Sequence, residues 1–538
     1  MANKILVIGN KGDPVRIVSG GPSDPVILTD AGYKNLARIV TRGPSDPVRV
    51  IEDTRYAKFT YTGPAGILTI HKLTVASGSQ VTVDWGDGTT TIYNAGTGIR
   101  THNYANAGEF DVRMSPPAAI TGLYLIGTKI TLNSIDIKSC VNMDWFQITY
   151  LRGGEFNSRD VSAWRPSHFS FTNMRSGYLG EFNSKDISSW RPDYFHFSTM
   201  PIGYLGTFDS KDISDWNPSD FCYSDMPVGC LGTFNSSDIS SWTVLSFDFS
   251  VMPEGYLGTF NFSDISSWIV GYFRFGNMPS GYLGECNSSD ISSWRPYYFL
   301  IRELTEYPVT FNSSDVSSWR PDEFSLYNLS NCSGTFNSSD VSSWRPNLFA
   351  LYGISSGYLG TFNSSHLSSW RPEQFYLGMM PDGYLGTFNF SNISSWRCQA
   401  FNLLSMPEGY LGTFNTNDVS SWGDSMWLFE VSSMPSTYTI TITATKLSGW
   451  FAIYVLILKN NSLSQAKVDQ ILKDLWAAFP SRYESGGWIE LDGSNSAPSG
   501  ILQAANPPTT GKEYAYELVN DSQDINPSQK WDHIDISS

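Results

Sequence analysis

The stretch FNSSDVSSWRP, from Phe336 to Pro346, recurs with small changes along most of this chain of 538 residues. Its tryptophan marks eleven copies and returns every 26 residues, apart from two steps of 25. These tryptophans are Trp164, Trp190, Trp216, Trp242, Trp268, Trp294, Trp319, Trp344, Trp370, Trp396 and Trp422. Degenerate copies end at Cys140 and Trp450, so the repetition predicts a solenoid of about 13 stacked coils.

Each coil is expected to contain a short strand, a turn and a short convex segment. The pattern F-x-F alternates with period two, which predicts a strand with one apolar face. The segment M-P-x-G-Y-L-G is typical of a turn, because proline fixes φ and glycine permits positive φ. The aspartate of S-S-D-I-S-S-W is expected to cap a single helical or 3₁₀ turn. One Trp, three Phe and one Leu per coil are expected to form the core.

The last coil identifies the class of solenoid. LILKNNSL, from Leu456 to Leu463, has the spacing L-x-L-x-x-N-x-L and resembles the leucine-rich repeat. In the same register Phe195 and Phe197 take the two leucine positions, and Met200 takes the asparagine position. The copies of FNSSDISSW also resemble the BspA-like repeat of surface proteins, although Arg-Pro follows the tryptophan where that repeat has Asp-Val-Ser. The resemblance implies a mainly β, leucine-rich-repeat-like solenoid over residues 119–463, with a right-handed parallel β-helix as the alternative.

Residues 61–118 differ from the repeats. The motif DWGDG at Asp84–Gly88, followed by His102, Tyr104, Gly108, Phe110 and Val112, resembles a PKD domain, and this implies a small β-sandwich. We expect Asp84 and Asp87 to accept hydrogen bonds from backbone amides in a hairpin turn, in preference to binding calcium. His102 is expected to be packed and not to be a metal ligand.

The two ends of the chain are expected to serve different purposes. Residues 1–60 carry three segments that begin with Asp-Pro (GDPVRIV, SDPVILTD and SDPVRVIED), and they have no evident core of their own. We expect this segment to anchor the chain to other virion proteins. Residues 464–538 are expected to cap the array with a helix at Ser464–Phe479 and a strand at Gly486–Asn495. The apolar face of this helix comprises Val468, Ile471, Leu472, Leu475, Trp476 and Phe479.

The composition excludes several classes of partner. The formal charge is -16, which disfavours binding to nucleic-acid backbones or anionic membranes. The most apolar run, Trp450–Leu458, is too short to span a bilayer, and MANKILVIGNKGD contains no recognisable secretory signal. The six cysteines are single replacements within the repeat and are expected to be buried thiols.

No catalytic constellation is recognisable, so we expect neither an enzyme nor a metal or cofactor site. The six histidines are scattered, and the chain has no P-loop, no G-x-S-x-G and no C-x-x-C motif. The repeat aspartates form one column, but His366 and Asn392 stand in the same column, so capping explains it better than catalysis. The repeat asparagines, such as Asn157, Asn183 and Asn235, are expected to bond backbone between coils.

Sequence variation is concentrated in one strip. The position between the two apolar residues of F-x-F holds nine residue types in ten coils, whereas N-S-S-D-I-S-S-W hardly changes. Strand side chains alternate between faces, so these variable positions point away from the core. The predicted ligand-binding residues are His196, Asp248, Arg274, Arg302, Tyr327, Tyr352, Tyr376 and Asn402. Diversity on a uniform scaffold favours a recognition surface, and neutral drift is the alternative.

These features favour a bacteriophage virion appendage, a tail or head fibre, that binds a host-surface glycan or protein through the variable strip. The absence of a recognisable signal favours a virion protein released by lysis, and a phage of gut bacteria is the expected setting. The alternatives are an adhesin on the bacterial cell surface, a purely structural capsid or head fibre, and a tailspike depolymerase. Whether the chain forms a homo-oligomer such as a trimer is left open.

Overall fold

The computed structural model describes residues 27–29, 49–51, 56–127, 131–152, 154–422, 426–441, 447, 450, 452–482 and 485–538. The chain divides into two compact units, Met1–Phe182 and Asn183–Ser538. The parallel coils make about 12 turns with a period of about 26 residues. Most of the predicted anchor lies outside the described residues, apart from β1 (Ile27–Thr29) and β2 (Arg49–Ile51), which pair in parallel.

The first unit begins with antiparallel strands and continues into parallel coils. Strand β3 pairs antiparallel with β6 and β8, and β4 pairs antiparallel with β5, β6 and β7. Strand β7 then pairs in parallel with β9, and β9 with β11, so the coils start here. The elements are β3 (Ala57–Gly63), β4 (Gly66–Asp84), β5 (Thr90–Tyr104), β6 (Gly108–Ser115), η1 (Pro117–Ala119), β7 (Ile120–Ile126), β8 (Thr131–Asp136), β9 (Trp145–Thr149), β10 (Gly154–Glu155), η2 (Ser158–Val161), β11 (His168–Thr172) and β12 (Tyr178–Leu179).

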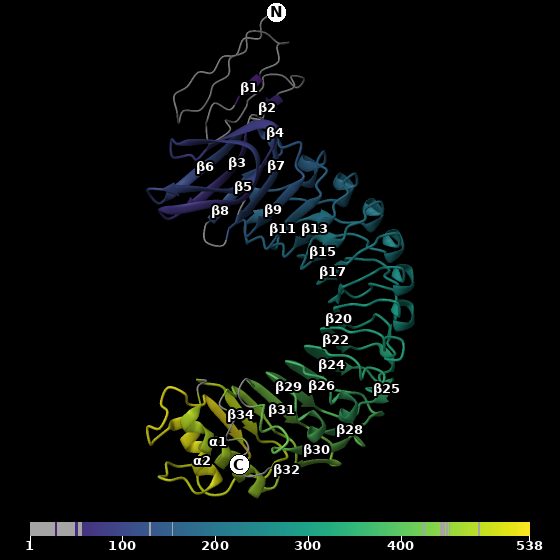
Figure 1. Cartoon of the computed structure of the whole chain (residues 1–538), viewed down its shortest axis with the longest axis vertical. Coiled ribbons are helices and arrows are strands. Elements are labelled where there is room, and N and C mark those ends of the chain that lie inside the picture. Colours follow the sequence, from purple (N-terminus) through teal and green to yellow (C-terminus); the bar gives the residue numbers. More distant parts are fainter. Residues whose placement is uncertain are drawn as a thin grey trace, which may run out of the picture. The chain divides into compact units, whose positions relative to one another are not determined.

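The second unit is built on one long parallel sheet, which lines the inner side of its arc (Figure 1). Each main strand pairs in register with the strand of the next coil. The strands of this sheet are β13 (Tyr194–Ser198), β15 (Asp220–Ser224), β17 (Ser246–Ser250), β18 (Tyr272–Gly276), β20 (Tyr298–Leu304), β22 (Glu323–Leu329), β24 (Leu348–Ile354), β26 (Gln374–Gly378), β29 (Ala400–Leu404), β31 (Leu428–Ser432), β33 (Val455–Ile457), β34 (Trp488–Leu491) and β35 (His533–Ile536).

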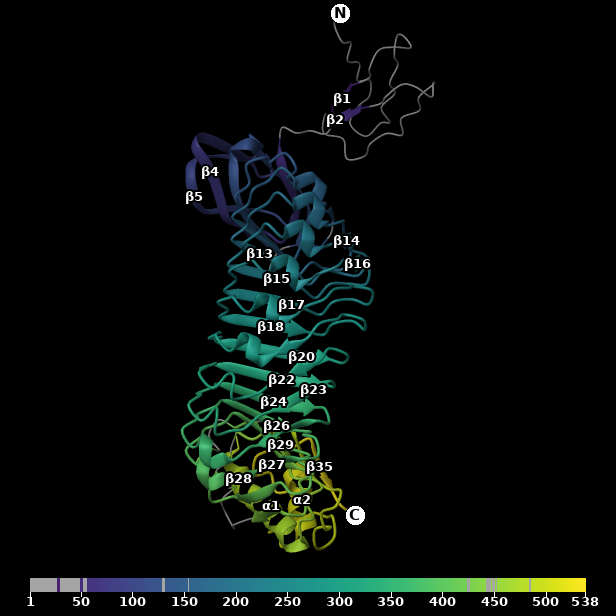
Figure 2. The same cartoon turned by 90° about the vertical axis from the view of Figure 1, so that its right-hand side faces the viewer.

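Single 3₁₀ turns lie on the outer side of the arc, and a second set of short strands completes the coils (Figures 1 and 2). One long sheet opposite 3₁₀ turns confirms the expected leucine-rich-repeat-like solenoid. The turns are η3 (Ser184–Ile187), η4 (Ser210–Ile213), η5 (Ser236–Ile239), η6 (Phe262–Ile265), η7 (Ser288–Ile291), η8 (Ser364–Leu367) and η9 (Phe390–Ile393). The short strands are β14 (Gly206–Thr207), β16 (Cys230–Leu231), β19 (Cys286–Asn287), β21 (Val309–Thr310), β23 (Cys332–Thr335), β25 (Tyr358–Thr361), β27 (Tyr384–Leu385), β28 (Thr387–Asn389), β30 (Leu411–Asn415) and β32 (Tyr438–Thr441).

The core consists of stacked aromatic columns. All eleven repeat tryptophans are at most 2% exposed, which confirms the predicted internal column. The phenylalanines of successive strands stack on one another, with ring centroids 5.6 Å apart for Phe195 and Phe221. The leucine of G-Y-L-G was expected in the core, but it lies outside the core: Leu205 is 52% exposed. It lies instead over the next coil, where a Cβ atom on Gly229 would meet it at 2.8 Å.

The end of the second unit is closed by two helices. Helix α1 (Gln465–Ala478) buries Val468, Ile471, Leu472 and Leu475, as predicted. It continues into η11 (Phe479–Ser481), and the predicted final strand is β34. Helix α2 (Gly511–Asn520) and strand β35 were not predicted, and β35 extends the main sheet beyond β34. Among the described residues, no helix is both long and apolar enough to cross a membrane.

Candidate functional site

The strand face of the second unit presents three outward positions per coil. In a five-residue strand such as β13, the second and fourth side chains, Phe195 and Phe197, are fully buried. The first, third and fifth side chains therefore point to the other side of the sheet. Parallel register keeps each position in line with the same position of the next coil. All eight predicted ligand-binding residues lie on this face. Five are at the third position (His196, Asp248, Arg274, Tyr376 and Asn402), and three are at the fifth (Arg302, Tyr327 and Tyr352).

The third position is more crowded than the sequence suggests. Asp248 is 9% exposed and Asn402 is 7% exposed, while His196, Arg274 and Tyr376 are half-buried. Side chains on neighbouring strands lie only about 4.8 Å apart, so they cover one another. The third position therefore offers part of each side chain to a ligand and uses the remainder in contacts along the sheet.

His196 belongs to a polar chain across two coils. Its Nε2 atom lies 2.7 Å from the Asp220 carboxylate, and its Nδ1 atom lies 2.8 Å from the Tyr194 hydroxyl. The Tyr194 and His196 rings also stack, with centroids 4.0 Å apart. Both ring nitrogens thus have partners within the protein, which fixes the orientation of the imidazole.

Asp248 and Arg274 neutralise each other. The Arg274 Nη1 atom donates to the Asp248 carboxylate at 3.3 Å, and the Ser250 hydroxyl donates to its other oxygen at 2.7 Å. Burial raises the pKa of the Asp248 carboxyl, and Arg274 acts in the opposite direction. Arg274 therefore has a partner of opposite charge within the face itself.

Asn402 is held by the following coil. Its amide Nδ2 donates to the Glu430 carboxylate at 2.6 Å, and the Ser432 hydroxyl donates to the other oxygen of Glu430 at 2.6 Å. Burial raises the pKa of Glu430. The Asn402 Oδ1 atom is buried and accepts no hydrogen bond from the described residues.

Arg302, Tyr327 and Tyr352 occupy the fifth position of three successive strands. The rings of Tyr327 and Tyr352 are stacked, with centroids 5.3 Å apart and an interplanar angle of 10°. The neighbours in this column are Gly276 and Gly378, so the three large side chains have no side chain beside them on either flank. Tyr376 belongs to the third column, opposite Ala350, and does not continue the stack.

These three coils also have a different backbone. Strands β20, β22 and β24 have 7 residues each, whereas β18 and β26 on either side have 5. The two added residues bring a third buried position into the sheet, where Leu304, Leu329 and Ile354 pair in register. The stacked tyrosines thus belong to the variant strands β22 and β24. Together with β20, these strands lie near the middle of the main sheet of the second unit (Figure 1).

A left-handed backbone follows the fifth position in every coil from β13 to β31. The values of φ include 56° at Thr199, 57° at Val251, 51° at Glu303 and 49° at Met379. This conformation costs free energy for residues other than glycine and asparagine, and the cost is large for a β-branched residue such as valine. The amide of Val251 still donates to the Gly276 carbonyl of the next coil at 3.0 Å, so this bulge keeps the ladder intact. Asp225, Asn277, Asn328 and Gly353 stand at this position in four of the coils, and residues of these types favour positive φ, but the pattern was not recognised in the sequence.

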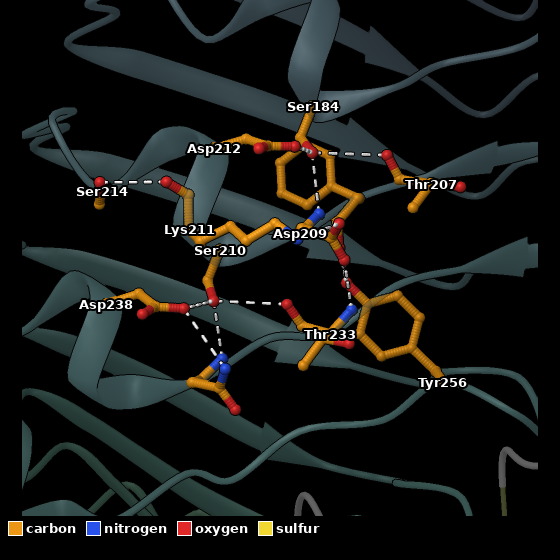
Figure 3. A network of polar contacts seen from close by, with 12 residues as sticks. Ser184, Thr207, Asp209, Ser210, Lys211, Asp212, Ser214, Thr233, Asp238 and Tyr256 are labelled. Atoms are coloured by element: carbon orange, nitrogen blue, oxygen red, sulfur yellow. Dashed lines mark hydrogen bonds and ion pairs between the residues drawn. The ribbon is translucent and has the colours of Figure 1, made fainter.

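The repeat aspartates on the opposite side of the coils bond serines and do not cap helices, so the capping prediction is wrong. The described 3₁₀ turns η3, η4 and η5, for example, have no side-chain cap hydrogen bond. The buried Ser184 hydroxyl donates to Asp212 at 2.7 Å, and Ser210 donates to Asp238 of the next coil at 2.5 Å (Figure 3). His366 takes the same role beside Ser338 at 2.8 Å. A contact that recurs between successive coils, with a substitute that preserves it, is the mark of a structural ladder.

The asparagine ladder is confirmed. The side-chain oxygen of Asn183 accepts a hydrogen bond from the Thr207 amide of the next coil at 2.9 Å. Asn235 accepts from Thr259 at 3.0 Å, and Asn461, in the leucine-rich-repeat position, donates to Val431 at 2.6 Å. These side chains therefore link the backbones of neighbouring coils.

The first unit offers no stronger site. Asp84 and Asp87 accept hydrogen bonds at 3.0 Å from the Gly86 and Thr89 amides, as predicted for a turn. His102 stacks on Trp85 and bonds Asp87 at 2.7 Å. A separate cavity of about 380 Å³ in this unit is lined by Ile135–Lys138, Phe156, Asn157 and Arg159–Val161. In the described part of the chain, no group of three or more His, Cys, Asp or Glu side chains is placed to hold a metal ion.

Comparisons with known proteins find a likeness in structure but none in sequence. No protein-family profile and no curated protein matches the sequence. The structure is similar to that of an internalin (inlF) from Listeria monocytogenes, with 11% sequence identity and a TM-score of 0.30. The alignment covers 78% of this chain and 88% of the internalin.

Proposed function

We propose that the protein is a non-enzymatic binding appendage of a bacteriophage virion, and that the strand face of its solenoid recognises a glycan or protein on the host surface. The observation that carries the proposal is the concentration of sequence variation at the outward positions of that face. On the outer side of the coils, the exposed position of Ser237, Ser263 and Ser289 varies less, because it holds serine in seven of eleven copies. Drift on solvated surfaces would have scattered both sets, so selection for different contacts on the strand face explains the pattern better.

The chemistry of the face supports recognition. Tyrosine supplies the outward side chains at Tyr272, Tyr298, Tyr327, Tyr352 and Tyr376 in the central coils. Tyrosine combines a large rigid contact area with a hydrogen-bonding hydroxyl, which is why binding surfaces are rich in it. The regular ladders behind the face hold these side chains at fixed spacings, and a preorganised surface loses little entropy on binding.

The virion context and the anchor role of residues 1–60 belong to the same proposal. Strand β3 begins at Ala57 and its Phe59 is 1% exposed, so a deletion that spares the first unit has to stop before that residue. Deletion of residues 1–55 should leave binding to cells intact and prevent incorporation into particles. Normal incorporation of the shortened chain would place the anchor elsewhere.

Binding is tested with the labelled full-length chain on a panel of bacterial strains and on polysaccharide extracted from them. We expect saturable binding to few strains, competition by the polysaccharide or surface protein of those strains, and no shortening of the polysaccharide with time. Equal binding to all strains, or to none, would contradict recognition, and shortening of the polysaccharide would favour a depolymerase.

A further inference from the structure

Arg302 differs from the other basic residue of the predicted site in forming no ion pair and no hydrogen bond with a described side chain, although its charge acts to lower the pKa of Glu323 against the effect of burial. Arg274 is paired with Asp248, whereas Arg302 forms no ion pair within 4.0 Å with any described residue. Its Nε atom is buried and has no hydrogen-bond partner. A buried donor without a partner costs free energy, and a guanidinium donates best to a carboxylate or another planar anion. The structure thus leaves an anion-binding group unused on the face of an acidic protein.

The surroundings of Arg302 fit a sugar better than a protein. Tyr327 and Tyr352 follow it in the same column, and Gly378 leaves the outer face of the Tyr352 ring without a neighbouring side chain. Aromatic faces of this kind suit the apolar face of a pyranose ring. At the third and fifth positions of strands β13 to β31, no described large hydrophobic side chain is exposed. A protein partner would need such an apolar centre.

The backbone holds this group in place. A Cβ atom on Gly276 would lie 2.2 Å from the Arg302 carbonyl oxygen, and one on Gly378 would lie 2.6 Å from the Leu404 carbonyl oxygen. Side chains are therefore excluded from both flanks of the column. Beside it, the Asn328 amide donates to the Glu303 carboxylate at 2.8 Å, so Glu303 has a partner of its own.

We propose that Arg302, Tyr327 and Tyr352 form a subsite for a short acidic oligosaccharide, in which the Arg302 guanidinium binds a sugar carboxylate and the tyrosines support the neighbouring rings. Four strands from Arg302 to Gly378 span about 14 Å, which suits a few linked sugars. The inference rests on the proposed function and adds to it the charge and chemical class of the ligand.

The test uses the full chain and a panel of oligosaccharides that carry glucuronate, galacturonate or sialate, each with its carboxyl-reduced counterpart. We expect at least one acidic oligosaccharide to bind. Its carboxyl-reduced form should bind at least about tenfold more weakly, because it loses one charged hydrogen-bonded contact. Arg302→Gln should remove this preference. Arg320→Gln, which deletes the same charge at a residue bonded to its own coil through the Ser317 carbonyl, should keep it.

The outcomes separate this inference from the proposed function. Equal binding of acidic and reduced sugars by the parent chain would overturn the acidic subsite and leave glycan recognition standing. Tighter binding of a hexaglutamate peptide than of every sugar would overturn it in favour of an acidic protein partner. Absence of binding to all probes, by a chain that still binds whole cells, would also overturn it. Arg302→Lys keeps the charge but loses the planar guanidinium, and it serves as a control for misfolding. This variant should bind the acidic oligosaccharide at a level between the parent chain and Arg302→Gln.

Discussion

At the scale of single residues, the tryptophan column carries the packing of each coil. Trp294 is 1% exposed and packs against Phe273, with ring centroids 5.2 Å apart. Replacement by alanine leaves a cavity that the flanking coils cannot fill without losing their own stacking. The invariance of this position therefore follows from volume and shape.

Trp294→Ala should lower the free energy of unfolding by about 3–5 kcal/mol, the cost of truncating a large buried aromatic residue. Trp427→Ala is the matched control, because that side chain is 42% exposed. Urea unfolding followed by far-UV circular dichroism measures both. Similar destabilisation by the two substitutions would show that burial in the column is not what makes Trp294 matter.

The serine–aspartate ladder contains its own control. Asp238 accepts a hydrogen bond from the buried Ser210, but Phe262 replaces the serine that would face Asp290. Asp238→Ala should therefore lower the free energy of unfolding by about 1–3 kcal/mol, because the buried Ser210 hydroxyl loses its charged acceptor. Asp290→Ala should cost about 0.5 kcal/mol or less, as for an ordinary surface change. Equal losses would mean that the aspartates act within their own coils.

The role of these aspartates shows what sequence can and cannot give at this scale. A buried tryptophan at a fixed period is recognisable, because nothing else explains its repetition. In the sequence, an aspartate before an apolar residue looks the same in two cases. It can cap its own turn, or it can accept a hydrogen bond from a serine of the preceding coil. Only the geometry distinguishes the two, since the donor, Ser210, lies 28 residues away from Asp238.

At the scale of elements, most strands and helix α1 were predictable, because the period-two and helical patterns survive in every copy. The long strands β20, β22 and β24 were not predicted, although the chain gave a signal. Their coils lack the Met-Pro turn that ends the strand elsewhere, and two steps shorten to 25 residues there. Helix α2 also had a signature, because Thr510 and Glu513 form a capping box.

This capping box predicts a pH dependence for helix α2. The Thr509 backbone N–H is the main cause that lowers the pKa of Glu513 to about 2, and the Thr509 hydroxyl and the Thr510 amide contribute. A lowered carboxylate pKa stabilises the fold fully above the ordinary value of 4.5, and this contribution is lost as pH falls from there towards 2. A carbon-13 titration of the Glu513 carboxyl should give a midpoint near 2, whereas a midpoint near 4.5 would show that the box does not form. Glu513→Gln should remove the pH dependence of amide protection in Gly511–Asn520.

At the scale of the whole molecule, each unit has its own construction. In the first, an antiparallel β-structure leads into parallel coils through β7, and in the second the coils end against two helices. Helices α1 and α2 connect β33 to β34 and β34 to β35, so they take the place of the 3₁₀ turns in the last coils. The solenoid was predictable from repetition, and helix α1 of its cap from the spacing of apolar residues. The contacts between side chains of the variable strip could not be predicted from the sequence, because they join residues about 26 positions apart. These contacts decide which residues of the strip are paired.

This sorting sharpens the predicted site. His196, Asp248, Arg274 and Asn402 have partners within the protein, whereas Arg302 forms no ion pair and no hydrogen bond with a described side chain, and Tyr327 and Tyr352 stack on each other. Groups that already have partners lose them on binding a ligand, so the net gain is small. The central coils are therefore the part of the strand face best suited to recognition.

The most direct test of recognition by the strand face is the affinity of the full chain for host cells after Tyr327→Ala, Tyr352→Ala and Tyr376→Ala are combined. A matched triple variant on the outer side, Ser237→Ala, Ser263→Ala and Ser289→Ala, is the control, with circular dichroism to show that both chains fold. We expect the tyrosine variant to bind at least about tenfold more weakly, a loss of ~1.4 kcal/mol, and the serine variant to bind as the parent does. Equal affinity of the tyrosine variant and the parent would contradict recognition by this face.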